Sequence, residues 1–336
     1  MMGEQDLDRS ITVSVVVPVY RGEQTLAPLV TEIARLIEPR TSSEGHRFRV
    51  SEVVLVWDCG PDRSDEVIRD LATAHDWVRP VWLSRNYGQH AATLAGMASS
   101  AGDWVVTLDE DGQHNPEDIG GLLDTALRER AQVVYGAPSN PPPHGAIRNL
   151  ASRATKAIWF KLLSDDAPRS FHSYRLVLGE VARSIAAYAG PGVFLDVALS
   201  WVIARSAEHS VVVREEGRAA TSYSYRRLAS HFWRLVITSG VRPLRLVTAL
   251  GFVVATSGFA LSAWIVFRRV TADVAVPGFA SVIVTILVIG GTILFSLGVI
   301  AEYVGAAVRS AMGRPLYVTV HDPRDSFPDA SANSSS

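Results

Sequence analysis

The stretch TVSVVVPV, at residues 12–19, is an almost continuous run of β-branched residues. Such a run predicts a strand that other elements cover on both faces, as in the interior of a parallel sheet. A polar turn, YRGE, follows at residues 20–23, and apolar residues then recur at helical spacing over 24–36. A buried strand that leads into an amphipathic helix is typical of α/β folds.

The same alternation of strand and helix continues to residue 135. It predicts a Rossmann-like α/β domain with a mostly parallel sheet and helices on both faces. Ligands of such sheets bind beyond the carboxyl ends of the strands, and polar clusters follow the strands at 20–23, 58–62, 84–89 and 109–113. The further strands are predicted over 52–57, 78–83, 103–108 and from 133, and the further helices over 64–74, 90–100 and 115–128.

The composition narrows the class of protein. The chain has 336 residues and a net charge of −2, which gives no support to a nucleic-acid partner, because such a partner requires a basic face. The single cysteine, Cys59, excludes an intramolecular disulfide and fits a reducing compartment. The N-terminal segment is polar and acidic, unlike a signal peptide. We therefore expect residues 1–225 to form a cytoplasmic globular domain.

Two long apolar runs without a charged residue lie at 246–267 and 279–301. Because about 20 apolar residues cross a bilayer as a helix, the runs predict a transmembrane hairpin at 246–301. Two buried helices in a large soluble core are the alternative. Arginine is commoner outside the runs than between them, which places both ends and the globular domain on the cytoplasmic side of the inner membrane. The arginines are Arg226, Arg227, Arg234, Arg242 and Arg245 before the runs, Arg309 and Arg314 after them, and Arg268 and Arg269 between them.

Three further segments have a distinct composition. Residues 226–245 combine arginines with apolar residues at helical spacing, which predicts an amphipathic helix at the membrane interface, with an ordinary surface helix as the alternative. Residues 146–163 are basic and amphipathic, which predicts a helix. This helix could guide an anionic ligand or be an ordinary surface helix. The tail at 302–336 is expected in the cytoplasm and is rich in serine, aspartate and proline from about residue 322, which predicts disorder there.

The sharpest polar cluster is DEDGQ, at residues 109–113, directly after a predicted strand. Adjacent carboxylates repel one another unless water or a cation compensates their charge. Mg²⁺ prefers one or two carboxylates together with substrate phosphates. The cluster is therefore a candidate site for a metal ion that neutralises a diphosphate leaving group. A solvated acidic turn ahead of a helix is the alternative.

Four stretches in order resemble the family-2, GT-A-fold glycosyltransferases, and among them the polyprenyl-phosphate glycosyltransferases related to dolichol-phosphate-mannose synthase. They are VSVVVPVYRGEQTL (13–26), VVLVWDCGPDRSDEVI (53–68), LSRNYGQHAATLAG (83–96) and GDWVVTLDEDGQHNPEDI (102–119). SYSYRRL, VRPLRL and GRPLYV resemble the juxtamembrane and tail motifs of bacterial two-span undecaprenyl-phosphate members, and NYGQH resembles the aminoarabinose transferases. The resemblance covers nearly the whole chain. It implies an inverting transferase that moves a sugar from a UDP- or GDP-linked donor to undecaprenyl phosphate.

The resemblance also implies roles for single residues. Those that would bind the donor are Pro18, Tyr20, Glu23, Asp58, Arg85, Asn86 and Asp109, with Asp58 near the nucleobase and Gly88 helping to shape the site. Asp109, Asp111 and Gln113 match the family's ligands for Mg²⁺ or Mn²⁺ and the diphosphate. Arg175 falls on the arginine of the family's FRL motif, and a guanidinium fork is well suited to a phosphate.

The sequence departs from the family pattern at three places. Trp57 and Cys59 replace the first aspartate and the glycine of the VDDGS stretch, so base recognition can differ, and the first turn has Arg-Gly in place of Asn-Glu. Ser173 stands where many relatives have an aspartate proposed as catalytic base. A phosphate acceptor is largely ionised at pH 7, with a second pKa of about 6, so it hardly needs a base and must mainly be held in line. The candidate catalytic residues are Asp111, Ser173, Arg175 and Asp196. Asp196 is a weaker candidate than the others, and Asp166 is a further weak candidate.

Two other functions remain open from the sequence. One is a processive polysaccharide synthase of the same superfamily, although the Q-x-x-R-W motif of such enzymes is absent from this chain. The other is a catalytically inactive accessory protein of the membrane. The expected partners are a nucleotide-sugar, a polyprenyl phosphate, the membrane and further copies of the chain. The sequence does not identify the sugar.

Overall fold

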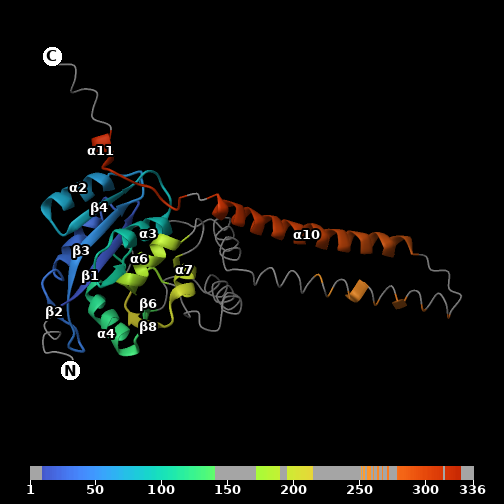
Figure 1. Ribbon diagram of the computed structural model, residues 1–336, viewed down its shortest axis with the longest axis horizontal. Helices are drawn as coiled ribbons and strands as arrows, with labels where there is room; N and C mark the ends of the chain where they lie inside the picture. The colour runs from blue at the N-terminus through green and yellow to red at the C-terminus, as the bar shows by residue number, and fades with distance from the viewer. Residues whose placement is uncertain are drawn as a thin grey trace, which may run out of the picture. The chain divides into compact units, whose positions relative to one another are not determined.

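The structure is a computed structural model that describes residues 10–140, 172–189, 195–214, scattered positions between 251 and 271, 278–312 and 315–326. It divides into two compact units (Figure 1). One unit comprises residues 1–152, 166–222 and 315–336, and the other comprises 153–165 and 223–314. The basic segment at 146–163, the interfacial segment at 226–245 and Asp166 all lie outside the described residues.

The first unit is built on a sheet with the strand order β8-β6-β7-β5-β1-β3-β4-β9. Parallel pairs join β1 to β3 and β5, β3 to β4, and β6 to β8, whereas β7 lies antiparallel between β5 and β6. Short antiparallel strands, β2 on β3 and β9 on β4, complete it. The strands are β1 (Ile11–Val19), β2 (Arg40–Thr41), β3 (Arg47–Trp57), β4 (Val78–Leu83), β5 (Trp104–Thr107), β6 (Val133–Pro138), β7 (Arg175–Leu178), β8 (Ser206–Val211) and β9 (Thr319–Val320).

The expectation of a mostly parallel sheet is therefore corrected to a mixed sheet. The α/β alternation up to β6 is confirmed, and it produces the parallel part around β1. The antiparallel pairs come from β7, which returns between two strands already in the sheet, and from the short strands β2 and β9.

Helices cover both faces of this sheet, as the alternating pattern predicts. Within β1, Val13, Val15 and Val17 belong to one core and Val16 belongs to the other, because successive side chains of a strand point to opposite faces. The first core includes side chains of α1 (Leu26–Ala34), α2 (Ser64–Ala74) and α4 (Ile119–Glu129, after a 3₁₀ turn at Pro116–Asp118). The second includes side chains of α3 (Gln89–Ser99), α6 (Gly179–Tyr188) and α7 (Leu195–Val202).

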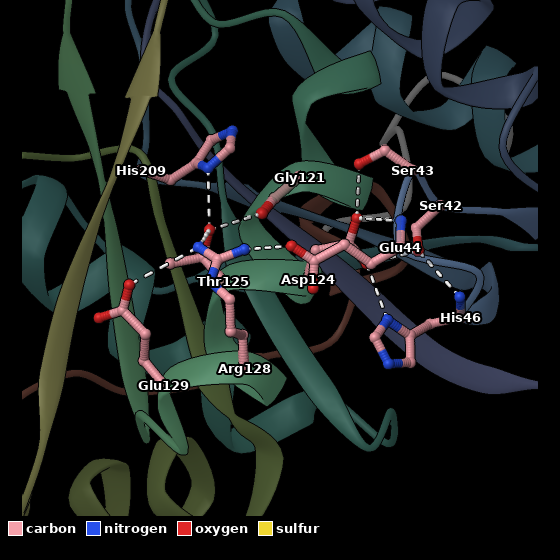
Figure 2. A network of polar contacts seen from close by, with 10 residues as sticks. All are labelled: Ser42, Ser43, Glu44, His46, Gly121, Asp124, Thr125, Arg128, Glu129 and His209. Carbon is pink, nitrogen blue, oxygen red and sulfur yellow. Dashed lines mark hydrogen bonds and ion pairs between the residues drawn. The ribbon is translucent and has the colours of Figure 1, made fainter.

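The turn between β2 and β3 is held on α4 by a buried carboxylate, Asp124 (Figure 2). Asp124 accepts hydrogen bonds from the Ser42 hydroxyl, from the Ser43 hydroxyl at 2.8 Å and from the Glu44 N–H at 3.0 Å. The His46 Nδ1 lies 2.8 Å from Oδ1, the oxygen that also binds Ser42, whereas Ser43 and Glu44 donate to Oδ2. Burial alone would raise the pKa of Asp124, but the hydrogen bonds from Ser42, His46, Ser43 and Glu44 together lower it. This network lies apart from the polar clusters at the carboxyl ends of the strands.

The C-terminal segment returns to the sheet of the first unit. β9 pairs with β4, and the Ser84 N–H donates to the Val318 carbonyl at 2.9 Å. The Arg69 guanidinium, which stacks over Trp82, binds both oxygens of Asp322, at 2.7 Å from Nε and 2.8 Å from Nη2. A short helix, α11 (Pro323–Ser326), follows. Ordered structure thus extends to residue 326, beyond the expected onset of disorder at about 322.

The second unit contains the helix α10 (Phe279–Ala311), which begins with the second apolar run and continues beyond its end at residue 301. Several of its large apolar side chains, such as Ile286 and Leu294, are exposed. Most of the first apolar run, 246–267, lies outside the described residues. Among the residues that the structure does describe, no helix combines the length and the hydrophobicity that crossing a membrane requires. The two expected spans are therefore not confirmed by the structure.

Candidate functional site

A cavity of about 200 Å³ opens at the carboxyl ends of β1 and β5. Because β7 is antiparallel to β5, with Arg175 paired to Thr107, the start of β7 lies at the same edge of the sheet. The first turn of α3 and the start of α7 supply further walls. The lining residues are Pro18, Gln89, His90, Thr93, Thr107, Leu108, Asp109, His172, Ser173, Arg175 and Asp196. Five of the predicted site residues, Pro18, Asp109, Ser173, Arg175 and Asp196, are thus brought together.

Asp109 is fixed in this cavity by neutral donors. One carboxylate oxygen accepts from the Gln89 side-chain amide at 2.6 Å, and the other accepts from the Ser173 hydroxyl at 2.5 Å. Its backbone N–H donates to Nδ1 of the buried His114 at 3.3 Å, and the His114 ring stacks on Tyr174 at 4.9 Å. Each donor comes from a different element, so the position of Asp109 depends on the fold rather than on its own turn.

Glu110 and Asp111 are engaged in different contacts. The Glu110 carboxylate accepts the backbone N–H groups of Tyr20 at 2.8 Å and of Arg21 at 2.9 Å, and so holds the turn that follows β1. Asp111 accepts the Gln113 N–H at 3.0 Å and closes a turn in which Gly112 has a φ of 76°. Among the described residues, no group of three or more His, Cys, Asp or Glu side chains is arranged to hold a metal.

The carboxylates of Asp109 and Asp111 nevertheless suit a hard divalent cation. Burial lowers the pKa of His114, and both carboxylates oppose this shift while Arg175 adds to it, so all three charged groups lie near this ring. Mg²⁺ commonly takes only one or two protein carboxylates and fills its other positions with water and substrate phosphates. Asp109 in the lining of the cavity and Asp111 two positions along the same turn fit that pattern, and a third protein ligand is not required.

Arg175 and Asp196 form a buried ion pair on the wall of the cavity. Arg175 is 4% exposed and Asp196 is 9% exposed, and Nη1 of Arg175 donates to Oδ1 of Asp196. The hydroxyl of Tyr135, which is fully buried, donates to the same oxygen at 3.4 Å. Burial raises the pKa of Asp196, and the contacts with Arg175 and Tyr135 offset this shift in part. Burial and the adjacent carboxylate also raise the pKa of Tyr135, so its hydroxyl stays protonated.

Asp58 is placed as an anchor of the loop after β4. Its two oxygens accept the backbone N–H groups of Tyr87 at 2.7 Å and of Gly88 at 2.8 Å. Burial raises the pKa of Asp58, although these two hydrogen bonds and the charge of Arg85 lower it in part. Each oxygen keeps a further lone pair, so the nucleobase contact expected for Asp58 stays a prediction beside these two backbone contacts.

The loop after β3 approaches the loop after β1 very closely. The Asp58 N–H donates to the Val19 carbonyl at 2.8 Å, and a Cβ placed on Gly60 would lie 1.8 Å from the Tyr20 carbonyl oxygen. Cys59 adopts a left-handed conformation, with a φ of 48°, and its thiol donates to the Leu83 carbonyl at 3.1 Å. Only glycine allows this approach at position 60, so the loops after β1 and β3 form one packed rim.

The remaining predicted residues lie around this rim rather than in the cavity. Tyr20 is 41% exposed, and the Arg21 guanidinium lies over its ring. Glu23 accepts the Arg63 N–H at 3.3 Å, Arg85 lies over the Tyr87 ring at 4.2 Å, and Asn86 is exposed. The Gln113 carbonyl accepts the Arg214 N–H at 2.9 Å.

Sequence reasoning did not select Gln89 and His114, which both hold Asp109. The location of Gln89 was a usable signal, because it ends the polar cluster at 84–89 that follows β4. His114 gave no comparable signal, since its role depends on a ring that stacks on Tyr174, 60 positions along the chain from it. Tyr135 was also missed, because a tyrosine within a predicted strand is normally interpreted as a core residue.

The α/β unit carries acidic and cationic groups at the carboxyl edge of its sheet, and sequence comparisons show the family to which it belongs. Residues 14–177 match the model of glycosyl transferase family 2, and residues 242–307 match the GtrB C-terminal hairpin. The chain is 30% identical over 312 residues, 91% of its length, to an undecaprenyl-phosphate 4-deoxy-4-formamido-L-arabinose transferase of Pseudomonas paraeruginosa, and covers 88% of that relative. The chain therefore belongs to glycosyl transferase family 2 and is a glycosyltransferase.

Other relatives are similar to the chain over most of its length. It is 26% identical over 306 residues to a prophage bactoprenol glucosyl transferase homolog of Escherichia coli, with 91% of this chain and 97% of that protein covered. Among solved structures, glucosyl-3-phosphoglycerate synthase from Mycobacterium tuberculosis matches 69% of this chain and 80% of its own, with a TM-score of 0.46 and 20% identity. The expected resemblance to polyprenyl-phosphate glycosyltransferases is confirmed by the named relatives.

Proposed function

We propose that the chain transfers a sugar from a UDP- or GDP-linked donor to a polyprenyl phosphate, with inversion at the anomeric carbon. The observation that carries this proposal is the meeting of Asp109 and Arg175 in one cavity at the carboxyl edge of the sheet. Asp109 lies on the side of the loops that we assign to the donor, and the guanidinium of Arg175 is well suited to a phosphate. Full-length relatives named as undecaprenyl-phosphate and bactoprenol transferases support the choice of acceptor.

The donor side is proposed to consist of the rim formed by the loops after β1, β3 and β4. A divalent cation, held by Asp109 and Asp111, would stabilise the negative charge that develops on the diphosphate as the sugar leaves. Gln89 and Ser173 already fix both oxygens of Asp109. The carboxylate is therefore oriented before any ligand binds, which reduces the reorganisation that binding requires.

The acceptor is proposed to be an oxyanion that needs no strong base. The two carboxylates that line the cavity are both engaged, Asp109 by Gln89 and Ser173 and Asp196 by Arg175 and Tyr135. A neutral hydroxyl acceptor would need a general base, and the other side chains of the lining that could serve are His90 and His172. A phosphate monoester is already largely ionised at pH 7, with a second pKa of about 6, so it needs only positioning and a cationic partner such as Arg175.

We further propose that the hairpin at 242–307 anchors the chain in the inner membrane with the first unit in the cytoplasm. The two uncharged apolar runs and the distribution of arginine support this assignment. A membrane location would also bring the enzyme to an acceptor whose prenyl chain lies in the bilayer.

A transfer assay tests the proposed function. The purified full chain in detergent is incubated with radiolabelled UDP- and GDP-sugars, undecaprenyl phosphate and Mg²⁺ or Mn²⁺, and label is counted in the organic phase. We expect label from at least one donor and none without the lipid. If no donor labels the lipid, while the chain still binds nucleotide, the acceptor assignment is wrong.

Two changes test the metal. Removal of divalent cations by EDTA and the substitution Asp111→Asn should each reduce transfer by at least about 100-fold, because a metal that neutralises a leaving diphosphate contributes several kcal/mol. Glu110→Gln, an acidic neighbour that holds Tyr20 and Arg21 instead, serves as the matched variant and should keep its dependence on metal. Full activity of Asp111→Asn in EDTA would contradict the metal role.

A further inference from the structure

The buried ion pair of Arg175 and Asp196 includes a third group, the Tyr135 hydroxyl, which a pair of opposite charges alone does not require. Arg175, Asp196 and Tyr135 come from three elements, β7, α7 and β6, and all three are almost fully buried. A guanidinium has five N–H donors in a rigid plane. Nη1 of Arg175 donates to Asp196, and Nε lies 3.4 Å from the Ser173 carbonyl. Neither of these contacts uses Nη2, and Arg175 lines the cavity.

The Asp196 carboxylate therefore restricts the orientation of the Arg175 guanidinium. Its Oδ1 holds one Nη1 donor, and the Tyr135 hydroxyl holds Oδ1 from a second direction. The Arg175 backbone is fixed as well, because its strand pairs with β5 and β6. With Nη1 and Nε both held, the Nη2 donors have a fixed direction and are not used by either contact.

The same pairing changes the electrostatics of the cavity. Asp196 neutralises the charge of Arg175, and the cation proposed at Asp109 and Asp111 would offset the charges of those two carboxylates. Net positive charge therefore does not explain how this cavity would bind an anion. Directed N–H donors remain as the source of affinity, and these donors depend on geometry.

We propose that Asp196, supported by Tyr135, is a positioning residue that orients the Arg175 guanidinium toward the phosphate of the acceptor. This inference rests on the proposed function, because it takes the ligand of Arg175 to be the acceptor phosphate. It assigns no proton transfer to Asp196. Its effect on the reaction passes entirely through Arg175.

The decisive experiment is a double-mutant cycle on the full chain in detergent, with undecaprenyl phosphate as acceptor. Asp196→Asn should lower kcat/KM for the acceptor by about 10- to 100-fold, as expected when a reacting group is misplaced by about 1 Å. The KM for the nucleotide-sugar should stay within twofold of wild type. In an Arg175→Met background, adding Asp196→Asn should change kcat/KM by less than twofold, because the residue through which Asp196 acts is already gone.

Two further variants separate positioning from folding. Asp124→Asn removes another buried carboxylate, which holds the β2–β3 turn instead (Figure 2). It should lower the unfolding midpoint while the acceptor kcat/KM stays unchanged. Tyr135→Phe is a milder change and should reduce acceptor kcat/KM by about 2- to 10-fold, again only while Arg175 is present. This variant provides the test if Asp196→Asn does not fold.

The outcomes distinguish a positioning role of Asp196 from an independent catalytic role and from a purely structural one. Equal losses from Asp196→Asn with and without Arg175 would mean that Asp196 acts on its own, for example as a base, and would overturn the proposal. A lowered unfolding midpoint with unchanged acceptor kinetics would reduce Asp196 to a structural residue and would overturn it too. A wild-type chain that does not label undecaprenyl phosphate at all is a failure of the proposed function and is seen before any variant is made.

Discussion

Replacing Asp58 by asparagine separates a loop anchor from a nucleobase contact. One oxygen of Asp58 accepts the Tyr87 N–H at 2.7 Å and the other accepts the Gly88 N–H at 2.8 Å. Asparagine keeps one acceptor oxygen, and its NH₂ group would face the second backbone N–H. One charge-assisted hydrogen bond is therefore lost, and one partly buried donor is left without an acceptor.

The size of the effect follows from these two losses. A hydrogen bond to a charged group contributes about 1.5–3 kcal/mol, and an unpaired buried donor costs about 1–3 kcal/mol. Because the loop after β4 can relax toward solvent, we expect the free energy of unfolding to fall by about 3 kcal/mol. At about 2–4 °C per kcal/mol for a domain of 150–250 residues, the unfolding midpoint should drop by about 6–12 °C.

The assay combines thermal unfolding, followed by tryptophan fluorescence, with the KM for the nucleotide-sugar. We expect Asp58→Asn to lower the midpoint and to raise this KM together, because Arg85–Gly88 border the proposed donor site. Asp103→Asn is the control, since Asp103 binds the Thr12 N–H and hydroxyl at the other end of β5. It should lower the midpoint without changing the KM. A wild-type midpoint for Asp58→Asn, together with lost donor binding, would refute the anchor and favour a direct contact with the base.

Three other changes have definite outcomes. Gly60→Ala should destabilise the chain by about 3 kcal/mol, because its Cβ would overlap the Tyr20 carbonyl at 1.8 Å; a thermal melt measures this, and an unchanged midpoint would contradict it. Arg69→Lys should cost about 1 kcal/mol, since the fork to Asp322 is lost, and should speed amide exchange in β9. Folding lowers the pKa of Asp124 below its ordinary value of about 3.9. The Asp124 carboxylate therefore stabilises the fold fully above that value, and this stabilisation is lost as the pH falls through the lower pKa of the folded state. The midpoint difference between wild type and Asp124→Asn should therefore shrink below pH 4, and a constant difference would contradict the lowered pKa.

Much of the sheet could be predicted because its central strands are buried on both faces. The run at 12–19 became β1 at Ile11–Val19, and the strand predicted over 78–83 became β4 at Val78–Leu83. Hydrophobic runs and periodicity report burial, and burial is what these strands share. The same signals contain no information about strand direction, so the antiparallel insertion of β7 and the pairing of β9 with β4 were out of reach.

The candidate site was predictable in its location but not in its contacts. The motif after β5 and Arg175 pointed to the residues that line the cavity. Which group holds which depends on approaches such as that of Ser173 to Asp109, 64 positions apart in the chain. For this reason the contacts of Asp58 with Tyr87 and Gly88 could not be foreseen and Gln89 was not selected at all, while the nucleobase contact of Asp58 stays a prediction.

The acidic turn shows how the structure changes the reason for expecting a metal. The sequence argument was that three adjacent carboxylates need a cation to offset their repulsion. In the fold, Glu110 instead binds two backbone N–H groups after β1, Asp111 closes its own turn, and Asp109 is held by Gln89 and Ser173. Folding of the turn therefore does not depend on a metal, and the proposed cation is needed only for the diphosphate. It follows that EDTA should stop transfer while leaving the unfolding midpoint of the free enzyme unchanged, whereas a midpoint that falls with EDTA would show that the metal also holds the turn together.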